Sequence, residues 1–165
     1  MGLFTRRRFT RAADAGFSVR LREEERALLA SLPDQLQALL AGGRSEATTR
    51  LFPPAYATDA DLDAEYQRLM GDELVQRRMD VLATFRDTVD RDHLTEPELA
   101  AWVGVLNDVR LVLGTLLDVS EDRDVLDVDP DAEDVTQRVV YVVLSEIVEE
   151  GVLALSGALP PPSRD

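Results

Sequence analysis

The sequence predicts a mainly α-helical protein, a bundle of about four or five helices with a short β-hairpin at its N-terminus. Three observations lead to this fold class. Leucines recur at helical spacing over residues 28–40, and a helix-initiating motif at Thr95 opens a long apolar segment. Strict alternation of apolar and polar residues, the pattern of a half-buried strand, is found near the N-terminus at residues 17–21.

Length and composition indicate one domain. The chain has 165 residues, and 45% of them are hydrophobic, which is enough for a buried core. We expect a hairpin over residues 1–22 packed on a helical bundle domain over 23–157. The proline-rich residues 158–165 are expected to form a disordered tail.

The hairpin is expected to consist of two short strands on either side of Gly16. Phe17, Val19 and Leu21 alternate with polar residues, which places all three on one face. A two-stranded hairpin is marginally stable alone, so this face must pack on the helices.

The first helix is expected to begin near Glu23, in a glutamate-rich segment that suits the positive end of a helix dipole. Gly42 should end it, and Pro33 should kink it or divide it in two. Residues 44–58 contain two prolines without helical periodicity and predict a connecting loop.

The second helix should begin after Asp59, whose side chain suits the N-cap position, and should run to about Val89. Gly71 is a position at which this helix could be divided. The third helix should follow Thr95, which forms a capping box with Glu98, and should run to about Leu117.

The third helix is apolar on nearly every side, which predicts that it lies at the centre of the domain. It nevertheless carries Asn107, Asp108 and Arg110 in close succession. Asn107, Arg110 and Gly114 share one stripe of the helix, and the glycine would allow a close approach at that level.

A buried arginine needs a partner, because an isolated buried charge costs several kcal/mol. Candidate partners for Arg110 are Glu146 and Glu149 on the last helix. Three hypotheses stay open for this group: a polar network that fixes helix register, a ligand or partner pocket around Arg110, or catalysis by Asp108 with Arg110. The first is the default interpretation of polar residues on a core helix.

The last helix is expected over residues 132–156. Its segment 139–144 is β-branched, but apolar residues continue on one helical stripe through it, so we predict a helix. The preceding residues 118–134 carry a net charge of −8. Their alternating aspartates resemble the start of a calcium loop, but Ala132 and Arg138 occupy the positions that need Gly and Glu. We expect a solvated acidic loop.

Composition excludes several chemistries. The chain has no cysteine and no lysine, which removes thiolate nucleophiles, cysteine-bound metals and lysine Schiff bases. Its single histidine, His93, stands in an acidic turn and is interpreted as solvated. We expect no catalytic residues, no metal and no cofactor, and we expect a cytoplasmic protein without a membrane span.

Charge is distributed unevenly along the chain. The whole chain has a net charge of −14, whereas residues 1–26 have a net charge of +3. Such an acidic protein is expected to bind duplex DNA weakly or not at all. The N-terminal basic cluster could be a DNA-contacting arm or a solvated hairpin face. Its members are Arg6, Arg7, Arg8 and Arg11.

Several segments resemble a known family. They are "LNDVRLVLGT", "FSVRLREEERALLASL", "RLFPPAY" leading into "DAEYQRLMGDEL", and "YVVLSEIVEEGVLALSG". Together they cover most of the chain. They resemble a bacterial, mostly actinobacterial, domain-of-unknown-function family whose members are described as oxidative-stress transcriptional regulators of the AosR type. The resemblance implies an α-rich fold and an intracellular regulatory role. A cysteine redox switch is excluded, because the chain has no cysteine.

We therefore expect a non-enzymatic regulatory protein that acts through protein–protein contacts. Its acidity suits a partner with a basic surface, such as RNA polymerase or a sigma factor. The alternative is a structural homodimer or adaptor domain with no transcriptional role. A small enzyme that uses Asp108 and Arg110 is the third possibility.

Overall fold

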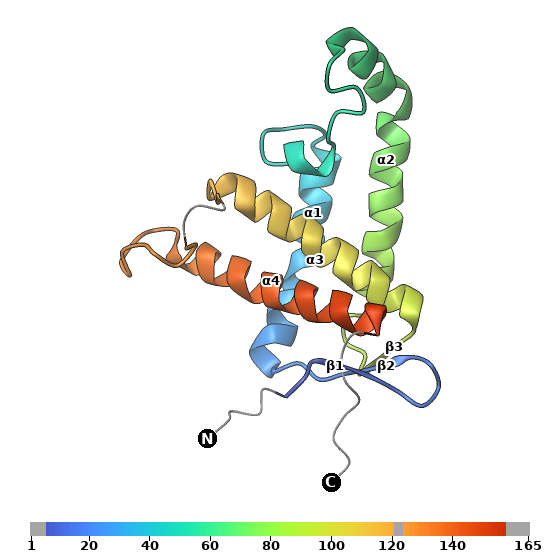
Figure 1. Cartoon of the computed structure of the whole chain (residues 1–165), viewed down its shortest axis with the longest axis vertical. Helices are drawn as coiled ribbons and strands as arrows, with labels where there is room; N and C mark the ends of the chain where they lie inside the picture. The colour runs from blue at the N-terminus through green and yellow to red at the C-terminus, as the bar shows by residue number, and fades with distance from the viewer. Residues whose placement is uncertain (1–5, 121–123, 158–165) are drawn as a thin grey trace.

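The computed structural model describes residues 6–120 and 124–157, and in these residues the protein is mainly helical with a small sheet at one end (Figure 1). Its α-helices are α1 (Glu23–Ala41), α2 (Ala60–Thr88), α3 (Glu96–Leu116) and α4 (Val135–Ser156). Its strands are β1 (Phe9–Arg11), β2 (Phe17–Val19) and β3 (His93–Leu94), and a short 3-10 helix, η1, spans Thr49–Leu51. The predicted fold class is confirmed. The predicted tail, 158–165, lies outside the described residues.

The predicted hairpin is present and gains a third strand. β2 lies between β1 and β3 and is antiparallel to both, with Phe9 opposite Val19 and Phe17 opposite Leu94. All four of these side chains are buried, so the sheet has one apolar face on the helices. β3 was not predicted, because a strand of two residues leaves no periodic pattern in the sequence.

α1 runs without interruption through Pro33, so the predicted division at this residue is wrong. Pro33 is buried between Leu32 and Leu36 on the core-facing side. Its ring therefore adds apolar contact, which offsets the hydrogen bond that a proline removes from a helix. Gly42 follows the last helical residue, as expected.

α2 is also a single helix, and Gly71 does not divide it. Asp59 caps it as predicted, because its carboxylate accepts a hydrogen bond from the backbone N–H of Leu62 at 3.0 Å. The buried residues of α2 are confined to its last two turns, at Leu82, Phe85 and Thr88. The earlier part of the helix projects beyond the other helices (Figure 1).

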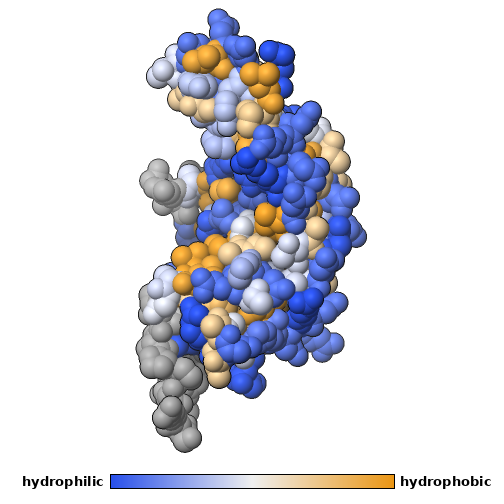
Figure 2. All heavy atoms as spheres, turned by 90° about the vertical axis from the view of Figure 1, so that its right-hand side faces the viewer, coloured by the Kyte–Doolittle hydropathy of each residue, from blue (hydrophilic) through white to orange (hydrophobic). Residues whose placement is uncertain are grey.

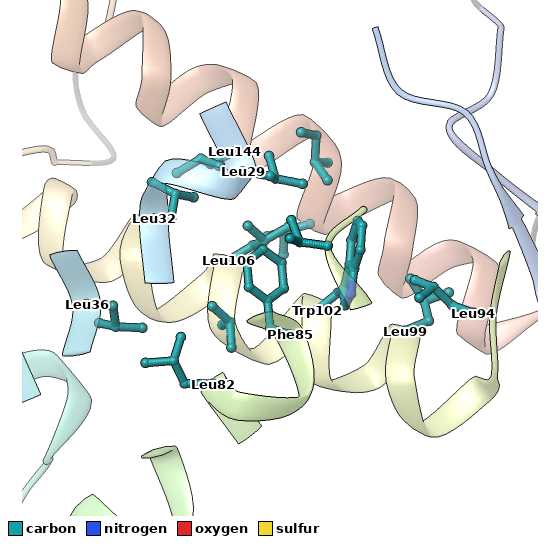
Figure 3. Close-up of a cluster of buried hydrophobic side chains, with 14 of the residues drawn as sticks. Leu29, Leu32, Leu36, Leu82, Phe85, Leu94, Leu99, Trp102, Leu106 and Leu144 are labelled. Atoms are coloured by element: carbon teal, nitrogen blue, oxygen red, sulfur yellow. The ribbon is translucent and has the colours of Figure 1, made fainter. Parts of the chain in front are cut away.

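α3 occupies the centre of the bundle, as its apolar surface predicts. Trp102 is fully buried and meets the ring of Phe85 edge to face, with ring centroids 5.2 Å apart (Figure 3). The ring of Phe9 also meets it edge to face, with the centroids 6.4 Å apart. Its indole N–H donates to the hydroxyl of Thr88 at 2.8 Å, which satisfies the buried polar group. Leu99 and Leu106 extend the same cluster along the helix.

Within the described residues, α3 is also the one helix long and apolar enough to cross a membrane, with a mean hydropathy of 1.4. Central helices of water-soluble folds meet the same criterion. Here Leu99, Trp102 and Leu106 are covered by side chains of the other helices and of the sheet. We therefore interpret α3 as a core helix.

α4 packs along α3, and its β-branched segment is helical as predicted. The helix begins at Val135 rather than at Ala132, because residues 131–134 form a turn. Gly157 ends it in the left-handed conformation, with φ of 70°. At Gly151 the two helices approach so closely that an added Cβ would lie 2.6 Å from a methyl group of Val103.

Candidate functional site

Arg110, the centre of the predicted network, bonds to a residue of its own helix. Its Nη2 donates to Oδ1 of Asn107 at 2.7 Å. This is its one polar contact among residues 6–120 and 124–157, so the predicted pairing with Glu146 or Glu149 is wrong. Both glutamates lie on the exposed side of α4, away from the seam with α3.

Asp108 is the member of this group that connects two helices. Its Oδ1 lies 2.5 Å from Nη1 of Arg78 on α2. The Nη2 of the same arginine donates to the carbonyl of Leu51 in η1 at 2.5 Å. Burial raises the pKa of Asp108 above its ordinary value, and the hydrogen bond and positive charge of Arg78 oppose that rise. One guanidinium therefore holds α2, α3 and η1 together.

Gly114 is buried, and the close approach predicted at this level is present. A Cβ added to it would lie 3.2 Å from Nη1 of Arg50 and 3.2 Å from Cε2 of Tyr141 on α4. The approaching groups are side chains rather than a neighbouring backbone. Gly114 thus makes room for these side chains at the seam between α3 and α4.

A second ionic cluster, which the sequence did not predict, surrounds Arg8. Its Nη2 donates to Glu25 on α1 at 2.8 Å and to Glu146 on α4 at 3.4 Å. Its Nη1 donates to Glu150 on α4 at 3.0 Å, and its backbone N–H donates to the same carboxylate at 2.5 Å. The Arg8 side chain is only 12% exposed. Arg8 is therefore a structural clamp between the hairpin and two helices and cannot act as a free DNA-contacting arm.

Glu25 is the most deeply buried carboxylate of this cluster, with 4% of the residue exposed. Burial alone would raise its pKa, but hydrogen bonds from Arg8 and Arg22 outweigh it and lower the pKa to about 2. Arg22 also donates its backbone N–H to Glu25 at 3.0 Å, at the start of α1. Glu25 is thus ionised at neutral pH and fixes the entry into α1.

The rest of the N-terminal basic cluster lies on the hairpin surface. The Arg11 guanidinium stacks 4.6 Å from the ring centre of Phe17 and donates to the carbonyl of Ala15 at 3.3 Å. Arg6 is exposed and Arg7 is partly buried. Arg11 therefore belongs to the face of the hairpin, which was one of the two alternatives for the basic cluster. Arg6 is exposed to solvent.

The acidic loop is organised locally by Arg138. This side chain donates to Asp134 at 2.9 Å and to the carbonyls of Val125 and Leu117 at 3.3 and 3.4 Å. Asp129 accepts from the backbone of Asp131 at 2.9 Å. In the described part of the loop, the aspartates bond within turns and do not converge on one point.

In comparisons with known proteins, one family model covers nearly the whole chain. The family described as Domain of unknown function (DUF2017) matches residues 6–155. The chain is a DUF2017 protein. The matched range includes the hairpin, both ionic clusters, α1, α2, α3 and all of α4 except its last residue. No curated protein and no solved structure matches the chain.

The polar clusters of this DUF2017 protein connect elements of its fold to one another. Arg78 and Arg8 each satisfy a buried carboxylate from another element. The Arg8 cluster also lines a surface hollow, in which Arg8, Glu25 and Glu146 lie beside the side chains of Arg6, Arg20 and Arg22. His93 bonds to Asp14 across the hairpin turn, with Nε2 3.0 Å from Oδ1. In the part of the chain that the structure describes, no three His, Cys, Asp or Glu side chains converge as metal ligands would.

Sequence reasoning missed Arg78, Glu25 and Glu150 as partners in these clusters. Arg8 is 17 residues from Glu25 and 142 residues from Glu150 along the chain. No local spacing links such residues. The sequence did contain a signal at Glu25, because this glutamate shares one helical face with Leu29 and Leu32 and stands three residues after Arg22.

Proposed function

We propose that this DUF2017 protein is a non-enzymatic regulatory protein that acts through protein–protein contacts. The observation that carries the proposal is a preformed arm outside the core. We define the α2 arm as residues 53–73, the loop before α2 together with its first four turns. No residue in this range is buried, yet the arm is folded and lies clear of the bundle (Figure 1).

The arm is held in shape by its own bonds. Oδ1 of Asp63 accepts the backbone N–H groups of Ala55 at 2.7 Å and of Tyr56 at 3.2 Å. The rings of Tyr56 and Tyr66 meet edge to face, with centroids 6.1 Å apart. A structured segment that contributes little to the core favours a role in binding, because its order costs conformational entropy without burying its apolar surface.

The regulatory part of the proposal rests on the resemblance to oxidative-stress transcriptional regulators of the AosR type. We propose a cytoplasmic actinobacterial protein whose partner has a basic surface, such as a sigma factor or RNA polymerase. The net charge of −14 supports a basic protein partner over free DNA. A reversible thiol switch is not part of this mechanism, because the chain has no cysteine.

A structural homodimer or adaptor without a transcriptional role is the second candidate. It is favoured by apolar side chains exposed along α4, at Val139, Val152 and Leu153. Sedimentation equilibrium measures the mass in solution directly. A monomer at micromolar concentration would exclude the homodimer.

Affinity capture tests the proposed function. The tagged full-length protein is used as bait in an actinobacterial lysate, and bound proteins are identified by mass spectrometry. We expect the bait to capture a component of the transcription machinery. This binding should persist after nuclease treatment, which removes nucleic-acid bridges, and should be released by high salt. Capture of no protein, or of proteins unrelated to transcription, would contradict the regulatory role.

A further inference from the structure

The outer face of the α2 arm carries an apolar stripe. Leu62, Tyr66 and Leu69 follow one another at i, i+4 and i+7, so they lie on one side of the helix. Leu62 is 43% exposed and Leu69 is 65% exposed. Tyr56, which is 43% exposed, extends the stripe sideways through its contact with Tyr66. Hydrophobic atoms are visible at this tip among hydrophilic ones (Figure 2).

Leu62 and Leu69 are exposed in the described structure, and Tyr66 is half-buried against the ring of Tyr56. The buried side chains of α2 begin only at Leu82, and they face the core. Leu62 and Leu69 lie on the opposite side of the helix from that residue, given the 100° rotation per residue. An exposed apolar patch bordered by polar groups is typical of a binding surface.

The border of the stripe is acidic. Residues 59–73 contain six carboxylates and a single basic side chain, Arg68, which gives a net charge of −5. Arg68 lies 3.9 Å from Glu65 and thus already has a carboxylate neighbour within the arm. Glu65 and Glu73 are exposed on either side of Leu69, and Glu73 pairs with Arg77 one turn further along α2. A second copy of the chain would bring the same negative charge, so self-pairing of this face is electrostatically disfavoured.

We propose that the α2 arm is a docking site for a basic amphipathic helix of a partner protein. The leucines and tyrosines would contact the apolar face of that helix, and the carboxylates around them would pair with its Arg or Lys side chains. Opposite charges would steer the encounter, while the apolar stripe would supply most of the affinity. This inference rests on the proposed function and names the surface and the chemistry of its partner.

A peptide pair tests the proposal with the full-length protein. The probe is a fluorescent synthetic peptide of about 18 residues with leucines on one helical face and arginines elsewhere. The control peptide has the same composition in scrambled order, so its charge is equal but its apolar face is lost. Fluorescence anisotropy measures both affinities at about 150 mM salt. We expect the amphipathic peptide to bind about tenfold more tightly than the scrambled peptide.

Protein variants locate the site. Leu62→Ser combined with Leu69→Ser should weaken binding of the amphipathic peptide about tenfold without changing the melting temperature, because both side chains are exposed. Val152→Ser combined with Leu153→Ser is the matched control on α4 and should leave the affinity unchanged. Glu65→Gln combined with Glu73→Gln should weaken binding and reduce its dependence on salt.

Equal binding of the two peptides, or unchanged binding by the leucine variant, would overturn the proposal. Equal loss in the α4 control would overturn it as well. Sedimentation that reveals a dimer dissociated by Leu69→Ser would identify a second copy as the occupant instead. A captured partner that still binds the leucine variant would refute this surface but keep the proposed function. Peptide binding at the arm without any captured regulator would support this surface but contradict the proposed function.

Discussion

At the scale of single residues, two arginines near the middle of the bundle differ in what their removal leaves behind. Arg78→Leu leaves the carboxylate of Asp108, which is 14% exposed, without its ion-pair partner. Arg110→Leu frees only an amide oxygen of Asn107 on the same helix. We expect the first change to lower the free energy of unfolding by about 3 kcal/mol and the second by less than about 1 kcal/mol. Urea unfolding of both variants measures the difference.

The outcome for Arg110 also decides between the hypotheses that the sequence left open. A loss near that of Arg78→Leu would mean that Arg110 supports the fold through a contact other than Asn107. Arg110→Lys is the matched control, since it keeps the charge but loses the planar fork. A folded Arg110→Leu variant that no longer captures a partner would favour the pocket hypothesis.

Glu25 should make stability depend on pH in the acid range. Its pKa is about 2 in the folded protein, against an ordinary value of 4.5. A carboxyl group with a lowered folded-state pKa stabilises the protein fully above pH 4.5, and this contribution is lost as the pH falls towards 2. The stability difference between wild type and Glu25→Gln should therefore shrink over that window. Unfolding measured from pH 7 to pH 2 tests this, with the exposed Glu149→Gln as control.

At the scale of elements, glycines in α3 and α4 have opposite roles. A Cβ at Gly151 of α4 would lie 2.6 Å from Val103, whereas a Cβ at Gly104 of α3 would have its nearest neighbour, Val81, at 3.9 Å. Gly151→Ala should therefore destabilise by about 1–3 kcal/mol through overpacking. Gly104→Ala should stabilise by about 0.5–1 kcal/mol, because alanine favours a helix. Thermal unfolding of the two variants should shift in opposite directions, and a shift in the same direction would contradict the packing described for α3 and α4.

At the scale of the whole molecule, charge limits what the protein can bind. The net charge is −14, and Arg8, which lies within the basic N-terminal segment, is already paired with carboxylates. We expect no sub-micromolar binding to duplex DNA at about 150 mM salt, because DNA affinity rests on neutralising phosphates. Anisotropy with a labelled duplex tests this. Tight binding that weakens in Arg6→Ala and Arg20→Ala variants would show that the outer hairpin face contacts DNA.

The composition also predicts insensitivity to mild peroxide. Sulfur oxidation is limited to Met1, Met70 and Met79, since the chain has no cysteine. We expect an unchanged sedimentation coefficient and unchanged peptide binding after treatment. A peroxide-driven change that dithiothreitol reverses would contradict this expectation, because sulfoxides are not reset by a simple thiol.

The sequence by itself determined the four α-helices and the N-terminal hairpin of this protein. Capping residues at Asp59 and Thr95, leucine spacing in α1 and the alternation around Phe17 act over a few residues, so the sequence displays them directly. Prediction from local sequence failed at Pro33, where burial among leucines outweighs the hydrogen bond that proline removes. It also failed at β3, a strand of two residues that forms by pairing with the edge of β2.

Only the tertiary structure decided which polar groups meet. Arg110 had plausible partners on α4, but it bonds to Asn107 in the folded protein. Glu146 pairs with Arg8 instead, and Asp108 pairs with Arg78. The rotation of each helix about its axis sets these pairs, and it follows from how all the apolar faces pack together. The same packing leaves the start of α2 outside the core. The apolar stripe of the α2 arm is therefore a property of the folded molecule, although each of its residues is visible in the sequence.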